Sequence, residues 1–201
     1  MNTQIERIIK LEWDMFQEVK NIGGRASCQN DFETFEIMRR SQYSNWTPEM
    51  RVCWLNFLNE CRNDGRNPVM EKYARMMEYT DTAYYDRGLA PALPKVPHGN
   101  YLLVNKITDR LVLWEKDFAA CYPNLAGKSR PVTADGDASG FTSMETYARG
   151  ELLTYPAELL ELYLAYTDKL AAEGKSLSIM IEDTMVKLYG YKSIDDAEKR
   201  A

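Results

Sequence analysis

Apolar residues recur every three to four positions along most of the chain, which is the period of an amphipathic α-helix. No convincing run alternates apolar and polar residues in the two-residue period of a strand. The pattern predicts helices over residues 3–20, 31–45, 48–63, 68–80, 100–121, 143–154, 156–173, 177–189 and 194–200. We therefore expect an all-α protein, a helical bundle of about nine helices.

Local signals at the ends of these segments support the helices. Capping boxes and first-turn prolines predict helix starts, at Asn30 with Glu33, Thr142 with Glu145, Pro48 and Pro156. Glycines that follow a helix predict its end, at Gly65, Gly174 and Gly190. A polar loop over residues 127–141 is long for a compact domain, and loops of that length are often functional.

Short motifs recur in the same order in the two halves of the chain. The matched pairs are residues 13–16 with 114–118, 21–25 with 124–130, 32–35 with 144–147, 47–48 with 155–156, 64–66 with 173–175, and 69–70 with 179–180. We interpret this order as an internal duplication within one domain, residues 1–201. The expected parts are a first helical unit (3–80), a connector (81–99), a second unit (100–191) and a tail helix (192–201), related by a pseudo-two-fold axis. Chance similarity between helical hairpins is the alternative.

Charged side chains stand at the centre of otherwise apolar helix faces. Glu12 projects from the middle of one such face and Arg39 from another, given the 100° step between residues of an α-helix. In the second unit, Glu151 matches Arg39, whereas Trp114 matches Glu12. A buried charge without a partner is costly, so these groups must pair, shift their pKa, or contact water or a ligand.

Three interpretations of these charges stay open. They form an interior salt bridge that fixes the helix packing, or they line a cavity that holds a polar ligand, or the helix register differs from the one assumed. In the ligand interpretation, Arg39 holds an anionic group, and Glu151 orients Arg39 or binds a cationic group. Glu12 acts as acid or base, because burial raises the pKa of a carboxyl group toward neutrality. Glu12 and Glu151 are the catalytic candidates.

Two loops at equivalent places in the halves are candidates for anion binding. Residues 23–29 and 127–131 each precede a helix and offer cations, hydroxyl groups and glycine amides. Arg25, Ser27, Lys128 and Arg130 would then close over a carboxylate or a phosphate as substrate-binding residues. The alternative is a pair of turns in which an arginine caps a neighbouring helix.

Composition narrows the classes of partner. The chain has 201 residues, 45% apolar and 27% charged, which is an ordinary globular balance for about one domain. A net charge of −5 and a pI near 5.1 argue against a nucleic-acid binder. No run of 18 apolar residues occurs, so we expect no membrane-spanning helix.

The cysteines and the single histidine exclude several chemistries. Cys28, Cys53, Cys61 and Cys121 lack the CxxC spacing of zinc sites, and His98 is the only histidine. We expect reduced thiols in a cytoplasmic protein, three of them packed on helices, and neither a metal nor a cofactor. Glu71 and Arg75 have the spacing of a solvated helix pair.

Several long motifs resemble one family. They include Asn21-Ile-Gly-Gly-Arg25, residues 71–80, Glu145-Thr-Tyr-Ala-Arg-Gly-Glu151 and Tyr189-Gly-Tyr-Lys-Ser193. They resemble a bacterial family catalogued as domain of unknown function 4125, over nearly the whole chain. The family name carries no activity, so no catalytic residue can be transferred from it. Relatives are sometimes joined to a nucleotidyltransferase-like domain, which implies a nucleotide or an acceptor partner.

Two function hypotheses follow from the sequence. The first is a site for a small anionic or zwitterionic molecule, for binding or for catalysis, between the two helical units. The second is a non-enzymatic helical module that binds another bacterial enzyme, such as a nucleotidyltransferase, with purely structural interior ions. The interior charges and the long polar loop favour the first hypothesis. The lack of an activated catalytic nucleophile or a cofactor-binding motif in the sequence favours the second.

Overall fold

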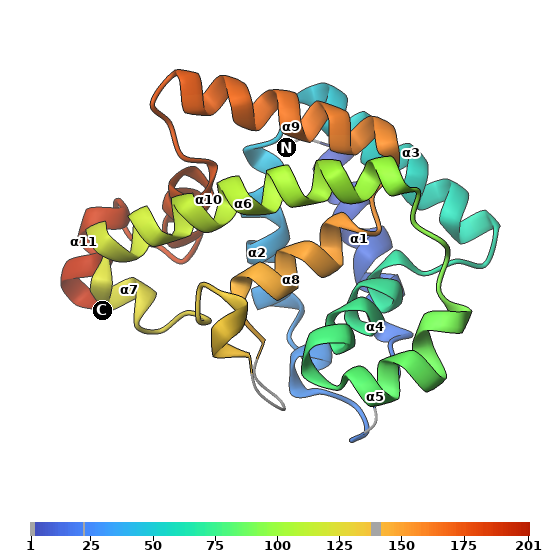
Figure 1. Ribbon diagram of the computed structural model, residues 1–201. Helices are drawn as coiled ribbons and strands as arrows, with labels where there is room; N and C mark the ends of the chain where they lie inside the picture. Colours follow the sequence, from blue (N-terminus) through green and yellow to red (C-terminus); the bar gives the residue numbers. More distant parts are fainter. Residues whose placement is uncertain (1–2, 22, 138–141) are drawn as a thin grey trace.

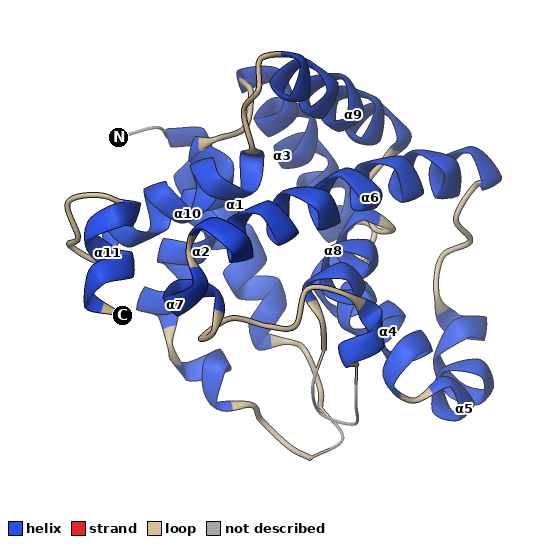
Figure 2. Cartoon of the chain, turned by 60° about the vertical axis from the view of Figure 1, so that its left-hand side comes forward, coloured by secondary structure: helices blue, strands red, loops and turns tan. Residues whose placement is uncertain are grey.

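The computed structural model describes residues 3–21, 23–137 and 142–201, and this part of the chain is helical without any strand (Figures 1 and 2). The helices are α1 (Thr3–Gln17), α2 (Phe32–Ser44), α3 (Pro48–Asn63), α4 (Pro68–Thr80), α5 (Thr82–Tyr84), α6 (His98–Cys121), α7 (Pro123–Ala126), α8 (Met144–Leu152), α9 (Ala157–Ala172), α10 (Leu177–Leu188) and α11 (Ile194–Arg200). The all-α prediction is confirmed, and each of the nine expected helices is present. The short α5 and α7 were not expected.

Each half of the chain packs around its first long helix. In the first half α1 contacts α2, α3 and α4, and in the second half α6 contacts α8, α9 and α10. Two contacts cross between the halves in a matched way, since α4 packs on α8 and α10 packs on α2. The helices α3 and α9 also pack on each other, and Figure 1 shows α6 running across the molecule beneath α9.

One large apolar core joins the two halves. Its fully buried members come from both of them, and include Ile8, Met50, Leu58, Val104, Leu159 and Leu177. Burying each such side chain contributes on the order of 1.5–3 kcal/mol, so these contacts dominate the packing free energy. A smaller cluster of Phe118, Val186, Ile194 and Ala197 attaches the tail helix α11 to α6 and α10.

The two expected capping boxes are each wrong by one residue. Asp31, not Asn30, caps α2 by accepting the Thr34 N–H, and Ser143, not Thr142, caps α8 by accepting the Thr146 N–H. Asn30 instead closes a 3-10 turn over Ser27–Asn30. A one-residue error is typical because neighbouring side chains can compete for the same free N–H groups.

The other end signals are mostly correct. Thr47 caps α3 with Pro48 in its first turn, whereas Pro156 is the cap residue of α9 and the helix begins at Ala157. The three expected C-terminal glycines all adopt positive φ, at 70°, 66° and 91° for Gly65, Gly174 and Gly190. The connector is partly helical, since it contains α5, a π turn (Tyr85–Leu89) and a 3-10 turn (Ala90–Ala92), and α6 already begins at His98.

The expectation of a solvated Glu71–Arg75 pair is wrong. Both side chains are buried, and they do not pair with each other. Glu71 instead binds Arg66 at 3.1 Å, and the Arg75 guanidinium donates to the Pro94 carbonyl at 2.8 Å. The proline connector folds back over α4 and covers this face, which the helical pattern alone could not reveal.

The cysteines are free thiols of unequal exposure. Cys61 is buried and Cys53 half-buried, as expected for packed helix positions, but Cys121 is exposed, as is Cys28. None of the described helices is long and apolar enough to cross a membrane. Residues 138–141 of the polar loop lie outside the described residues.

Candidate functional site

Four charged side chains from four helices meet in the interior. Arg39 of α2 lies at the centre, with its Nε 3.2 Å from Glu12 Oε2 and its Nη1 3.2 Å from both oxygens of Glu151. Lys72 of α4 completes the group, with its Nζ 2.5 Å from Glu151 Oε2. We call these four residues the ion cluster. The expected pairing of Glu12, Arg39 and Glu151 is confirmed, and the cluster carries two charges of each sign.

Glu12 is the most deeply buried member of the ion cluster, with 1% of its surface exposed. Its Oε1 accepts hydrogen bonds from the Tyr43 hydroxyl at 2.6 Å and the Trp54 indole N–H at 3.1 Å. Burial raises the pKa of Glu12, and the Arg39 charge only partly offsets this effect. The carboxylate is therefore held by the core of the first half.

Glu151 is the most heavily bonded member of the ion cluster. Besides Arg39 and Lys72, it accepts hydrogen bonds from Gln42 at 3.0 Å and from the Tyr155 hydroxyl at 2.8 Å. Burial would raise the pKa of Glu151, but the charges of Arg39 and Lys72 outweigh burial and hold the pKa well below its usual range. Glu151 is consequently an anion at any ordinary pH.

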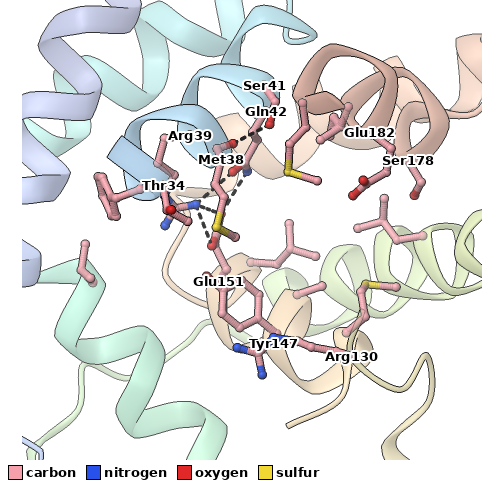
Figure 3. A pocket seen from close by; sticks show the side chains of 18 of the residues that line it. Thr34, Met38, Arg39, Ser41, Gln42, Arg130, Tyr147, Glu151, Ser178 and Glu182 are labelled. Atoms are coloured by element: carbon pink, nitrogen blue, oxygen red, sulfur yellow. Dashed lines mark hydrogen bonds and ion pairs between the residues drawn. The ribbon is translucent and has the colours of Figure 1, made fainter. Parts of the chain in front are cut away.

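A cavity of about 390 Å³ adjoins the ion cluster, bounded by α2, α6, α8 and α10 (Figure 3). Arg39, Gln42 and Glu151 line it at one end. Its walls are largely apolar, and include Phe35, Met38, Leu111, Met144, Ile181 and Met185. A volume of this size is typical of a site for a small organic molecule.

Besides Asp31, which caps α2, two further carboxyl groups line the cavity away from the ion cluster. They are Glu115 of α6 and Glu182 of α10, and Figure 3 shows Glu182 beside Ser178, across the cavity from Glu151. Burial and the Glu115 charge raise the pKa of Glu182 to about 7. Burial also raises the pKa of Glu115, although a hydrogen bond with Ser178 opposes the effect. Within the described part of the chain, neither carboxylate forms an ion pair.

Tyr147 of α8 joins the ion cluster to the mouth of the cavity. The Lys72 ammonium lies 3.4 Å from the centre of its ring, and the Arg130 guanidinium 5.1 Å from it. Burial opposes ionisation of the phenol, but Lys72 and Arg39 outweigh burial and lower its pKa. The cavity therefore contains a phenol with a lowered pKa, Tyr147, and a carboxyl group with a raised pKa, Glu182, which are groups that can exchange protons with a ligand.

The structure brings together only part of the candidate site predicted from sequence. Arg39, Glu151 and Arg130 line the cavity, but Glu12 lies behind Arg39 and does not. Arg25 is occupied by Gln17, Asn30 and the Gln29 carbonyl, and Ser27 lies in the 3-10 turn beside it. Lys128 donates to the Ala201 carbonyl at 2.7 Å. Arg25 and Lys128 thus have partners within the chain, and anion binding by the two loops stays a prediction.

Sequence reasoning missed Lys72, Tyr147, Glu115 and Glu182. The proposed match of residues 69–70 with 179–180 would pair Lys72 with Glu182. Both helices carry other charged residues, however, so neither position stands out in the sequence. Glu115 directly follows Trp114, which belongs to the apolar stripe of its helix. A single acidic residue next to such a stripe does not by itself indicate a functional site.

The family model described as protein of unknown function (DUF4125) matches residues 2–199. The chain belongs to this family. The resemblance noted in the sequence is thereby confirmed, and the DUF4125 match gives no activity or ligand. No curated protein and no solved structure matches the chain. The described residues of this DUF4125 chain contain no group of three histidine, cysteine or acidic side chains placed to hold a metal ion.

Proposed function

We propose that the cavity binds a small zwitterionic organic molecule, with its ammonium group between Glu115 and Glu182 and its acidic group toward Arg130. The observation that carries the proposal is the pair of carboxyl groups without a cation inside an apolar cavity. Burial raises the pKa of both groups and the Glu115 charge raises the pKa of Glu182 further, which costs folding free energy that a ligand ammonium would offset. Residues with perturbed pKa values in a cavity are the usual mark of a functional site.

The ion cluster supports a scaffold role rather than direct ligand binding. The Arg39 guanidinium already contacts Glu12, Glu151 and Gln42, so it has little capacity left for an anionic ligand. A purely anionic ligand is therefore disfavoured, because the unpaired charges that face the cavity from α6 and α10 are negative. The cluster instead fixes the wall that carries Tyr147.

Arg130 is the cation that remains available at the cavity. Its guanidinium donates to the Thr142 carbonyl at 3.0 Å and lies over the Tyr147 ring, and it has no carboxylate partner among the described residues. An exposed arginine held against an aromatic ring can bind a carboxylate in a bidentate manner. Arg130 is thus the natural partner for the acidic end of a zwitterion.

An internal duplication would explain why the cavity lies where it does. The neighbours of α1 among α2, α3 and α4 match those of α6 among α8, α9 and α10, and the crossing contacts of α4 and α10 match as well. The same correspondence relates Arg39 to Glu151 and Lys72 to Glu182. In this interpretation, the two halves have diverged in charge. The charges of the ion cluster balance one another, whereas Glu115 and Glu182 leave the other side of the pseudo-two-fold axis acidic.

A helical interaction module is the second candidate. One observation in its favour is that the members of the ion cluster pair with one another and need no ligand. The other is that Leu102 and Leu113, eleven residues apart on one face of α6, are 54% and 60% exposed. In that case the cavity carboxyl groups would have no ligand, and the binding experiment below would give a negative result.

The test compares three molecules that share a five-carbon chain: 6-aminohexanoate, pentylamine and hexanoate. Thermal unfolding and calorimetric titration should give the order 6-aminohexanoate, pentylamine, hexanoate from tightest to weakest. Glu182→Gln should weaken both amines by about tenfold or more, the usual effect of losing a charged hydrogen-bond partner. Asp117→Asn, an exposed carboxylate on the same helix as Glu115, is the control and should change nothing.

Two outcomes would overturn the proposal. One is the absence of any shift with either amine at millimolar concentration, which would favour the interaction module. The other is equal binding of the amines to wild type and Glu182→Gln, which would place the amines elsewhere.

A further inference from the structure

A second chamber of about 330 Å³ adjoins the main cavity. It lies between the C-terminal half of α6, the short α7 and residues 129–132. Its lining is mainly apolar, from Phe118, Ala119, Ala126, Pro131 and Val132. None of the sequence-predicted ligand positions other than Arg130 belongs to it.

Glu115 and Arg130 line both chambers. Glu115, whose carboxyl group we assign to the ligand ammonium, therefore borders the second chamber as well as the first. Arg130 also borders both chambers. The charged residues therefore lie at the junction, and the apolar surfaces lie on either side of it. This arrangement fits a ligand with its charged groups at the junction and an apolar part in the second chamber.

From these shared lining residues we infer that the two chambers form one elongated site, in which the proposed zwitterion also carries an apolar chain that extends past Glu115 into the second chamber. The inference rests on the proposed function and adds the shape and class of the ligand. The lining of small side chains gives the second chamber its volume, since a larger residue at Ala119 or Ala126 would fill it. Apolar lining without further unpaired charges calls for an alkyl or aryl group there.

The experiment uses n-alkylamines of four to ten carbons with the full chain. In wild type, affinity should rise about fourfold for each added methylene, the expected gain from burying one CH₂ group, until the second chamber is filled. Ala119→Phe fills the second chamber, and should leave the shortest amines unchanged while the rise stops at a shorter chain. Ala120→Phe is the matched control, because Ala120 is the next residue of α6, is exposed and lines neither chamber.

A second variant protects the test against misfolding at one position. Ala126→Phe approaches the same chamber from α7 and should give the same shortened profile. Identical length profiles for wild type, Ala119→Phe and Ala126→Phe, with normal binding of short amines, would overturn the elongated site but leave the proposed function intact. If no amine of any length binds wild type, the proposed function fails, and the inference fails with it.

Discussion

Arg39 and Glu151 lie 112 positions apart in the sequence, yet the Arg39 Nη1 atom is 3.2 Å from both carboxylate oxygens of Glu151. This contact joins α2 of the first half to α8 of the second half. Lys72 from α4 reinforces it, and Glu12 from α1 balances the charge. Because the four side chains are almost excluded from water, each one depends on its partners in the chain of contacts from Glu12 through Arg39 and Glu151 to Lys72.

Removing the central arginine should strongly destabilise the protein. Arg39→Met leaves Glu12 without a cation and Glu151 with Lys72 alone, and breaking a buried pair in this way costs about 3–5 kcal/mol. Urea unfolding measures the loss. Arg40→Met is the control, because the half-buried Arg40–Glu36 pair on the same helix should contribute about 1 kcal/mol or less. Equal losses for the two variants would contradict the central role of Arg39.

A second substitution should recover part of that loss. In Glu12→Gln/Arg39→Met, the carboxylate that lost its cation is replaced by a neutral amide that can still accept the hydrogen bonds of Tyr43 and Trp54. We therefore expect the double variant to be more stable than Arg39→Met alone, with a coupling free energy of roughly 1–3 kcal/mol. Additive losses in the double-mutant cycle would mean that Glu12 and Arg39 do not act as a pair.

The fold could be predicted much further than the site. Helical periodicity located the nine main helices because burial of an apolar stripe is a local signal, repeated along each helix. The charges of Glu12, Arg39 and Glu151 were recognisable for the same reason, as exceptions within a stripe. Lys72 could not be assigned, since its partner lies on α8 and only the packing of α4 on α8 brings them together.

The cavity carboxyl groups were harder still to predict. Glu115 and Glu182 come from helices that are neighbours only in the folded chain, and neither residue is part of a motif. For the loop cations, the spacing could not reveal that Arg25 and Lys128 have partners within the chain that would compete with a ligand. Sequence spacing predicts which residues share one helix face, but it does not say which faces meet.

Gly150 should be required where α4 and α8 approach most closely. A Cβ atom there would lie 2.7 Å from Met76 Cγ and 3.1 Å from the Lys72 carbonyl oxygen, on the backbone of the helix that carries Lys72. Gly150→Ala should therefore cost about 1–3 kcal/mol in urea unfolding, despite the higher helix propensity of alanine. Gly99→Ala, in α6 with no atom within 4 Å of its added Cβ, should cause no loss. A neutral Gly150→Ala would show that the two helices can separate freely.

Thiol labelling should locate a bound ligand. Cys28 is exposed and lines the main cavity, whereas Cys121 is exposed but lines neither chamber. Saturating 6-aminohexanoate should slow the reaction of Cys28 with a maleimide at least severalfold and leave Cys121 unchanged. Mass spectrometry of the labelled peptides separates the two sites. Equal protection of both cysteines would indicate a global effect instead of a ligand in the cavity.

The stability of the free protein should depend on pH through Glu182. Its pKa of about 7 in the folded protein lies above its ordinary value of 4.5, so the folded state binds more protons than the unfolded state between these values. The free energy of unfolding should therefore fall as pH rises from about 4.5 to 7, by at most about 3 kcal/mol from this group. Glu115 and Glu12, with raised pKa values, act in the same direction. Glu151, with a lowered pKa, matters only at lower pH.

Urea unfolding at pH 5, 6, 7 and 8 separates the contribution of Glu182 from those of the other groups. Glu182→Gln removes the group that titrates near neutrality, so its unfolding free energy should vary less with pH than that of wild type, and at pH 8 it should exceed it. Asp117→Asn, an exposed carboxylate on α6, should follow the wild-type curve. If Glu182→Gln has the same pH profile as wild type, the Glu182 carboxyl group is ordinarily ionised in the cavity. The pair would then cost little free energy, and the main reason to expect an ammonium ligand would be lost.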